Sequence, residues 1–334
     1  MKRFSLLVAC MTLVAGPALA QPRHQTGSLA APEPDPPAGE TLGYIPDVAQ
    51  RMTLDVSVAG RGPYRFVVDT GAERTVVSHQ LATELGLDPG GDVTLTSVAS
   101  VTRVPSVFLS GLEVGRRTIP TIRAPSLDGR NLGAAGMLGV DSLQSQRVVF
   151  DFRQQQLSLS NSHLEEQNWP GDTIVVTGRS RLGRLVLADA NLDGQKIRVI
   201  IDTGSQITIA NLALRRQLQR RGRLGDTRIL ELRGVAGDIA RAEYTRAGRI
   251  RIGDMHVDDL PIAFADVELF NQLGLSNRPA ILLGMDVLRM FDRVSIDFAN
   301  RRVRLLPPRS SVAPAAQLAS MGGSQTRTRL GGRF

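Results

Sequence analysis

The sequence contains the tripeptide Asp-Thr-Gly twice, and these two copies are the residues best suited to chemistry. One copy spans Asp69–Gly71 and the other Asp202–Gly204, and each directly follows a run of apolar, mostly β-branched residues. This pattern predicts a buried strand that ends in a tight turn, where glycine lets the backbone bend toward the carboxylate. If the two turns face each other, the carboxylates share a small dry site, and one pKa rises because neighbouring like charges cannot both ionise. The ionised member can then act as general base on water, while the protonated member polarises a carbonyl group.

Both copies belong to a longer internal repeat. The turn around Gly139 corresponds to the turn around Gly284, and the closing strand 147–152 corresponds to 293–298. The spacing is 133 residues at the aspartates and 145 at these glycines, so we expect the added residues in 266–279, where a short extra helix fits. A single Asp-Thr-Gly is a weak signal, but two copies in equivalent surroundings indicate two lobes that each deliver one carboxylate.

Local patterns place further elements around these turns. Ser78 and Asn211 are expected to cap short helices. Period-two alternation through 93–109 predicts a hairpin that turns near Ala99, and 230–238 is expected to form the tip of a second hairpin.

These motifs resemble those of the aspartic proteases. The repeat units are similar to retroviral-type (retropepsin-like) domains, and two are fused in one chain in the manner of a pepsin. The resemblance rests on 67–72 with 137–139 and on 200–205 with 282–284, and it covers about 47–307. It implies a mostly β, bilobal acid-protease β-barrel fold of two homologous lobes with short helices. It also implies a cleft between the lobes and water-mediated peptide hydrolysis without a metal or other cofactor.

By this resemblance Asp69 and Asp202 are the catalytic pair, and the two threonines interlock their loops. The residues expected to support these loops are Thr70, Gly71, Thr203, Gly204 and Ser205. The hairpin tips are expected to be flaps that close over a substrate, formed by Val98, Ala99 and Ser100 in the first and by Gly234, Val235, Ala236 and Gly237 in the second. Flap tips of this family are usually glycine-rich, which fits the second tip alone. The first flap is therefore expected to be stiffer or remodelled, and neither tip has the tyrosine typical of pepsin.

Other chemistries find little support in the sequence. The four histidines lack metal-ligand spacing, and we expect no metal site. A nucleophile elbow, a phosphate-binding loop and a dinucleotide fingerprint are all missing from the sequence. Asp141 and Asp286, at the starts of short helices, are expected to act as helix caps, and Asp151 and Asp297 to be structural.

The N-terminus is expected to be a signal peptide, residues 1–20. A basic pair precedes a short apolar run, and Ala18–Ala20 offers a cleavage site. The alternatives are a buried helix and lipid attachment at Cys10, the only cysteine. Cleavage would leave no cysteine, which excludes disulfides, thiolate zinc sites and cysteine nucleophiles. We expect an exported protein, periplasmic or secreted, of a bacterial envelope.

The remaining boundaries follow from composition. We expect a disordered proline-rich leader at 21–46, a first lobe at 47–160, a polar linker at 161–172, a second lobe at 173–307 and a disordered tail at 308–334. With 334 residues the chain has room for two domains that each bury a core.

The net charge of +8 falls to +6 when Lys2 and Arg3 are removed. Arginine clusters such as 220–223 lack interleaved aromatic residues, so nucleic-acid binding is not expected. A solvated basic face is the simpler interpretation, with at most peripheral contact with anionic membranes. The expected partner is a polypeptide substrate, and one chain suffices for activity because both repeats are present, although lobes could instead pair between chains.

The sequence therefore supports the hypothesis of an aspartic endopeptidase that uses Asp69 and Asp202. The competing hypothesis is a polypeptide-binding protein of the cell envelope that keeps the fold and cleaves little or nothing. Both motifs are intact, which favours the enzyme.

Overall fold

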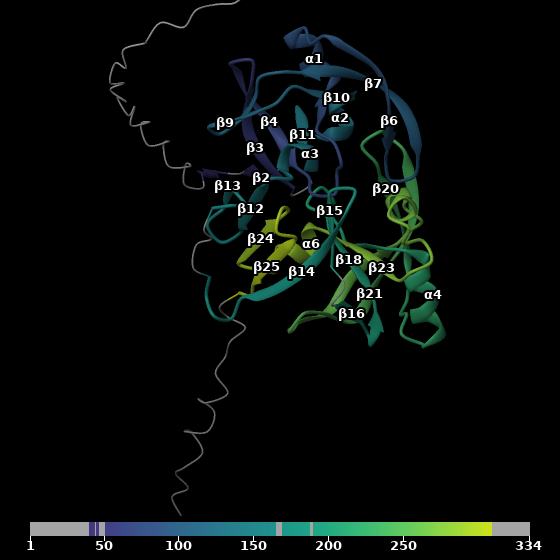
Figure 1. Ribbon diagram of the computed structural model, residues 1–334. Coiled ribbons are helices and arrows are strands. Elements are labelled where there is room, and N and C mark those ends of the chain that lie inside the picture. The colour runs from purple at the N-terminus through teal and green to yellow at the C-terminus, as the bar shows by residue number, and fades with distance from the viewer. Residues whose placement is uncertain (1–39, 44, 47–50, 165–168, 188–189, 309–334) are drawn as a thin grey trace, which may run out of the picture. The chain divides into compact units, whose positions relative to one another are not determined.

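The computed structural model describes residues 40–43, 45–46, 51–164, 169–187 and 190–308, all within one compact unit. The expected signal peptide, most of the expected leader and nearly all of the expected tail lie outside the described residues. The described chain is mostly β with short helices, and its strands form two sheets, which confirms the predicted fold class (Figure 1). No helix among the described residues is long and apolar enough to cross a membrane.

The first lobe is built on a ten-stranded sheet. Its elements are β2 (Ile45–Pro46), β3 (Met52–Val58), β4 (Arg61–Val68), β5 (Val76–Ser78), α1 (His79–Leu85), β6 (Pro89–Thr96), β7 (Val101–Leu109), β8 (Leu112–Val114), β9 (Arg117–Ile119), β10 (Ile122–Leu127), α2 (Gly129–Leu132), β11 (Gly136–Leu138) and α3 (Val140–Leu143). Strand β11 runs parallel to β4 with Leu138 beside Val68, so the Gly139 turn lies next to the Asp69 turn. Ser78 caps α1 as expected, since its Oγ accepts from Leu81 N.

The second lobe repeats this arrangement. Its elements are β14 (Ile174–Arg181), β15 (Arg184–Leu187), β16 (Ala190–Leu192), β17 (Gln195–Lys196), β18 (Arg198–Ile201), β19 (Ile209–Ala210), α4 (Leu212–Arg220), β20 (Arg228–Arg233), β21 (Ile239–Ile252), β22 (Met255–Phe264), α5 (Glu268–Gln272), β23 (Ala280–Leu283) and α6 (Met285–Leu288). Strand β18 runs parallel to β23 with Ile201 beside Leu283, so the second aspartate turn has the same surroundings as the first. Asn211 caps α4, and α5 falls inside 266–279, as the sequence predicts.

Closing strands of the two lobes pair with each other. They are β12 (Gln146–Asp151), β13 (Gln156–Asn161), β24 (Arg293–Asp297) and β25 (Arg302–Leu306). Antiparallel pairing of β12 with β24 sets Arg147 opposite Asp297 and Asp151 opposite Arg293. Both opposed pairs are ion pairs, at 3.1 Å and 2.8 Å, so Asp151 and Asp297 are structural, as expected.

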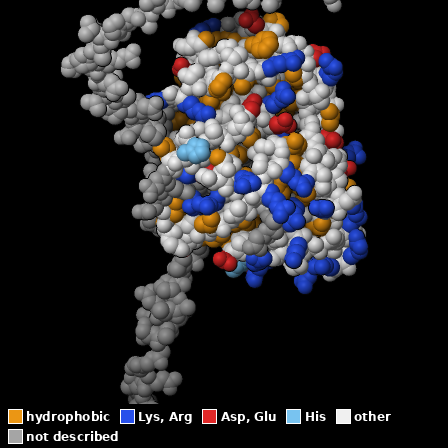
Figure 2. Space-filling view, in the orientation of Figure 1, with side chains coloured by type: hydrophobic (Ala, Val, Ile, Leu, Met, Phe, Trp, Pro, Cys, Tyr) orange, Lys and Arg blue, Asp and Glu red, His pale blue; other side chains and the backbone are white. Residues whose placement is uncertain are grey.

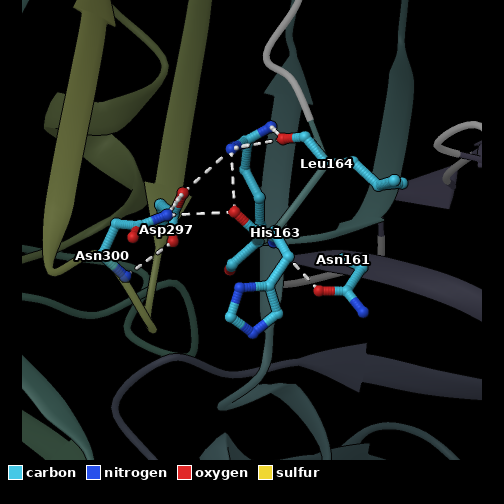
Figure 3. Close-up of polar contacts among 7 residues, drawn as sticks. Asn161, His163, Leu164, Asp297 and Asn300 are labelled. Carbon is cyan, nitrogen blue, oxygen red and sulfur yellow. Dashed lines mark hydrogen bonds and ion pairs between the residues drawn. The ribbon is translucent and has the colours of Figure 1, made fainter.

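The Arg147–Asp297 pair is the buried centre of a larger hydrogen-bond network (Figure 3). Arg147 also donates to the carbonyl oxygens of Ser162 and Leu164, and Asn300 donates to Asp297 and to the Ser162 carbonyl. The first residues of the expected linker are thus held against both lobes, while 165–168 lie outside the described residues.

A continuous apolar core runs through both lobes and consists mainly of valine, isoleucine and leucine. Few aromatic side chains are fully buried, and the largest are Phe66, Phe150, Phe264 and Phe270. The two lobes therefore pack as one body around their shared closing strands.

One boundary needs correction. Strand β1 (Glu40–Gly43) lies inside the segment expected to be a disordered leader, and it pairs with β13 at the edge of the closing strands. Its four residues are too few to show a periodicity, and its partner lies over a hundred residues away, so composition alone could not reveal the pairing.

Arginine side chains gather over α4 and its surroundings in the second lobe (Figure 2). Those exposed there include Arg216, Arg220, Arg221 and Arg223. This part of the surface is basic and open to solvent.

Candidate active site

The two Asp-Thr-Gly turns meet between the lobes. Asp69 N donates to Leu138 O at 3.0 Å, and Asp202 N donates to Leu283 O at 3.1 Å, so each aspartate is fixed to the parallel strand beside it. Both aspartates are buried, with 8% and 9% of their surface exposed. The structure thus brings together the two carboxylates that the sequence places far apart.

Each carboxylate is oriented by the turn that carries it. Asp69 Oδ1 accepts hydrogen bonds from Gly71 N at 2.7 Å and Ala72 N at 2.9 Å. Asp202 Oδ1 accepts from Gly204 N at 3.0 Å and Ser205 N at 3.1 Å. Within the described residues, Oδ2 of each aspartate receives no protein hydrogen bond, so these two atoms are available to a reactant.

Glycine is required at both turns for close approach. A Cβ on Gly71 would overlap the carboxylate of Asp202, and one on Gly204 would overlap that of Asp69. Each carboxylate therefore lies directly against the backbone of the opposite turn. This mutual contact shows that the two carboxyl groups face each other.

The threonines lock the turns together. Thr70 N donates to Thr203 Oγ1 at 3.0 Å, and Thr203 N donates to Thr70 Oγ1 at 3.2 Å. Each hydroxyl then donates to the strand of the opposite lobe, Thr70 to Ile201 O at 2.9 Å and Thr203 to Val68 O at 2.7 Å. All four of these hydrogen bonds are buried, so the two turns form one rigid unit that crosses the lobe boundary.

Asp141 and Asp286 lie in the first turn of their helices, which begin after Gly139 and Gly284, and not at the N-cap position. Each accepts from one backbone N–H of its own helix, Asp141 from Ser142 N at 2.8 Å and Asp286 from Val287 N at 2.9 Å. Asp141 Oδ1 also accepts from Thr75 N at 2.9 Å, and Asp286 Oδ2 accepts from Thr208 N at 3.0 Å. These carboxylates therefore join their own helix to the segment just after each Asp-Thr-Gly turn.

The surroundings of the aspartates change their protonation. Burial raises the pKa of Asp69 above its usual value, against the hydrogen bonds from Gly71 and Ala72. Burial, followed by the charge of Asp69, raises the pKa of Asp202 to about 7. Because each charge opposes the other, the pair retains one proton over a wide pH range.

A cleft of about 670 Å³ opens above the two aspartates. Its volume lies within the rough range of 300–1,000 Å³ that is typical of ligand pockets. Apolar side chains from both lobes line it, among them Val76, Leu95, Met137, Ile207, Ile209, Leu232, Val267 and Leu282. Charged side chains line it as well, so the aspartates lie in a cleft of mixed apolar and charged character that could hold an extended chain.

The tips of the two hairpins expected to be flaps lie at this cleft. Hairpin β6–β7 turns at 97–100, where Ser97 N donates to Ser100 O, and hairpin β20–β21 turns at 234–237, where Gly237 N donates to Gly234 O. Of the expected flap residues, Val98, Gly234 and Val235 line the cleft, whereas Ala99, Ser100, Ala236 and Gly237 are not among its lining residues.

Asp238 joins the two flap tips. Its Oδ1 accepts from Ser97 Oγ at 2.5 Å, and its Oδ2 accepts from Ala99 N at 2.6 Å. Ala236 N also donates to Ser97 Oγ, at 3.4 Å. The two tips are therefore held together in this structure by one carboxylate of the second flap.

Helix α5 holds the first flap in place. Glu268 N donates to Val98 O at 3.0 Å, and Gln272 Nε2 donates to Thr96 Oγ1. The equivalent helix of the first repeat is α2, which lies between β10 and β11 as α5 lies between β22 and β23. Its Asn131 side chain lies against Gly237 of the second hairpin tip, so each tip is flanked by the short helix of the opposite lobe.

Two residues of this site were missed by the sequence reasoning. Asp238 is the last residue of the expected hairpin tip 230–238 but was not named among the flap residues, and Arg184 reaches the cleft from the start of β15. Arg184 Nε donates to Gly71 O at 2.6 Å, across the lobe boundary. A signal for it exists in the repeat, since Arg51 and Arg184 are separated by 133 residues, the spacing of the two aspartates.

Two separate segments of the chain match known protein families. Residues 54–145 match the family described as gag-polyprotein putative aspartyl protease, and residues 188–287 match the family described as aspartyl protease. A search of curated proteins found no match. Each matched segment contains one Asp-Thr-Gly turn and the glycine turn that packs beside it.

Proposed function

We propose that this chain, which carries two aspartyl protease domains in tandem, is an endopeptidase that hydrolyses peptide bonds with a water molecule activated between Asp69 and Asp202. The two family matches support a protease-type function. The observation that carries the finer proposal is the pair of buried carboxylates, each held on its own turn and packed against the turn of the other.

The reaction needs one proton on the pair. Burial raises the pKa of both aspartates, and the charge of Asp69 further raises that of Asp202, so we take Asp202 as the protonated member and Asp69 as the ionised one. Asp69 takes a proton from water as the water oxygen attacks the peptide carbonyl carbon, and Asp202 gives its proton to the carbonyl oxygen. In the second step Asp69 gives the proton that it took from water to the amide nitrogen, and Asp202 takes a proton from a hydroxyl group of the tetrahedral intermediate. The C–N bond then breaks, which yields a carboxyl group and an amine.

The cleft suits a polypeptide, because apolar and charged side chains from both lobes line it. Residues of both hairpin tips, Val98, Gly234 and Val235, line the same cleft as the aspartates. A substrate strand between aspartates and flaps would lie beside backbone groups of both hairpins, as in other cases of strand addition.

The test is cleavage of casein and of a peptide library by the wild-type chain from acidic to neutral pH, with and without a transition-state-mimicking inhibitor of aspartic proteases. Asp69→Asn and Asp202→Asn should each abolish turnover. Both variants should remain folded, because each replaces one of two mutually repelling carboxylates by a neutral group of equal size.

Survival of activity in both variants would reject the proposal. A folded wild-type chain that binds peptides and cuts none of them at any pH would also reject it, and would favour a binding protein. Thermal unfolding of each variant serves as the folding control.

A further inference from the structure

Arg184 is a buried cation whose charge the reaction described above does not use. Its side chain is 6% exposed and lines the cleft, and its Nε donates to Gly71 O at 2.6 Å. Nη1 is buried without a hydrogen-bond partner in the described part of the chain. A guanidinium remains protonated in proteins, so a full positive charge lies at the base of the cleft.

Three acidic groups surround this charge. Glu73 Oε2, half exposed on the first lobe, is 4.0 Å from Nη1. Asp69 and Asp202 both interact favourably with Arg184, which lowers the pKa of each against the larger effect of burial. Burial lowers the pKa of Arg184, and the charges of Glu73, then Asp69 and Asp202, act in the opposite direction, so this guanidinium interacts with all three acidic groups.

The equivalent residue of the first repeat is placed differently. Arg51 Nη2 donates to Leu132 O at 2.5 Å, and its charge lowers the pKa of Asp69. Arg184 instead reaches across to the opposite turn and acts on both aspartates. The other charged side chains that line the cleft are Arg74, Arg233 and Glu231.

We propose that Arg184 is a positioning residue that serves as the counter-charge of the Asp69–Asp202 pair and keeps one carboxylate ionised in a site that buries both. Removing two carboxylates from water strongly favours the doubly protonated, inactive form. A cation bound to the Gly71 carbonyl opposes double protonation without occupying the space between the carboxylates. The inference rests on the proposed function only in that it concerns the same two aspartates.

The first test measures protonation without turnover. The full chain is labelled with ¹³C at the aspartate carboxyl carbons and titrated by NMR, with Asp69→Asn and Asp202→Asn to assign the signals. Loss of a nearby positive charge disfavours the carboxylate, so Arg184→Met should raise the pKa values of the pair by about one unit. Arg184→Lys keeps the charge and should show less than half of this shift.

The matched control is Glu73→Gln, which removes the opposite charge on the other side of the same guanidinium. It should lower the pKa values of the pair or leave them unchanged. An unchanged titration in Arg184→Met would overturn the proposal, as would an upward shift of equal size in Glu73→Gln.

The second test uses stability, so that a variant which fails to fold is also informative. Arg184→Met is compared in the wild-type chain and in the Asp69→Asn, Asp202→Asn double variant. Both comparisons lose the hydrogen bond to Gly71, but only the first loses a counter-charge. Destabilisation should therefore be large in the wild-type chain and small in the double variant, whereas equal losses, or failure to fold in both backgrounds, would show a purely structural role.

Cleavage assays separate this inference from the proposed function. In an active enzyme, both limbs of the pH profile of kcat/KM should move to higher pH in the Arg184→Met variant. The size of this move should equal the pKa shift seen in the titration. A chain that cleaves no peptide but shows the shifted titration would refute the proposed function and retain the counter-charge.

Discussion

Replacement of Asp297 by asparagine should destabilise the protein by removing one member of the buried ion pair between the lobes. Asp297 and Arg147 are 3% and 7% exposed, and Asp297 also accepts hydrogen bonds from Asn300 N and Nδ2. Removal of one partner from a buried pair leaves an uncompensated charge, which typically costs about 3–5 kcal/mol. Because the asparagine can still accept hydrogen bonds, we expect a loss of about 3 kcal/mol, at the lower end of this range.

The measurement is urea unfolding of the full chain at neutral pH. A lower midpoint with an unchanged dependence of the unfolding free energy on urea concentration indicates a loss of stability. The matched control is Asp258→Asn, which removes an exposed ion pair with Arg249 at 2.5 Å. Exposed ion pairs contribute little to stability, so Asp258→Asn should unfold at the same urea concentration as the wild-type chain. Equal midpoints for Asp297→Asn and Asp258→Asn would refute the view that this pair holds the lobes together.

The same pair predicts a pH dependence. Burial raises the pKa of Asp297, but the hydrogen bonds from Asn300 and the charge of Arg147 outweigh it, and the pKa is lowered overall. Its contribution is therefore present at pH values above the ordinary pKa of aspartate and is lost as the pH falls through the folded-state pKa. The difference in stability between wild type and Asp297→Asn should shrink in acid, and a difference independent of pH would contradict this assignment.

Three further predictions concern the cleft. Gly204→Ala should abolish cleavage, since the added methyl group overlaps Asp69; the assay is kcat/KM, and activity near that of the wild type would contradict the close approach of the turns. Asp238→Asn should weaken the junction of the flap tips and speed backbone amide exchange at Ala99 N, seen by hydrogen exchange, without a change in global stability comparable to that of a core substitution. Because the pKa of Asp202 is raised in the folded state, its burial costs stability as the pH rises from about 4 toward 7. Asp202→Asn should therefore be more stable than the wild type at neutral pH. Thermal unfolding should show that this advantage disappears in acid.

The local features of this protein follow from its sequence. The two Asp-Thr-Gly turns, the helix caps at Ser78 and Asn211, and the hairpin near Ala99 all occur where residue type and spacing predict them. Each depends on hydrogen bonds or side-chain periodicity within a few residues, so neighbours along the chain are sufficient to determine it. The repeat extends this reach, because two equivalent segments imply two equivalent lobes.

The sequence was less informative wherever a side chain finds its partner across the fold. Asp141 was expected to cap its own helix, and it does accept from Ser142 N there, but it also binds Thr75, which the strand pairing brings alongside. Strand β1 was expected to be disordered, and its pairing with β13 became apparent in the folded chain alone. In both cases a distant backbone segment provides a partner that local propensity does not reveal.

The sequence by itself determined which residues could form the reactive pair, because an aspartate at the end of an apolar strand has only a small number of structural uses. Tertiary structure decided the environment of that pair: how deeply both carboxylates are buried, which arginine binds the Gly71 carbonyl beside them, and how Asp238 joins the two hairpin tips. These properties depend on distances between groups that lie on different lobes. Electrostatic interactions act through space rather than along the chain, so only the packing of one lobe against the other sets their strength.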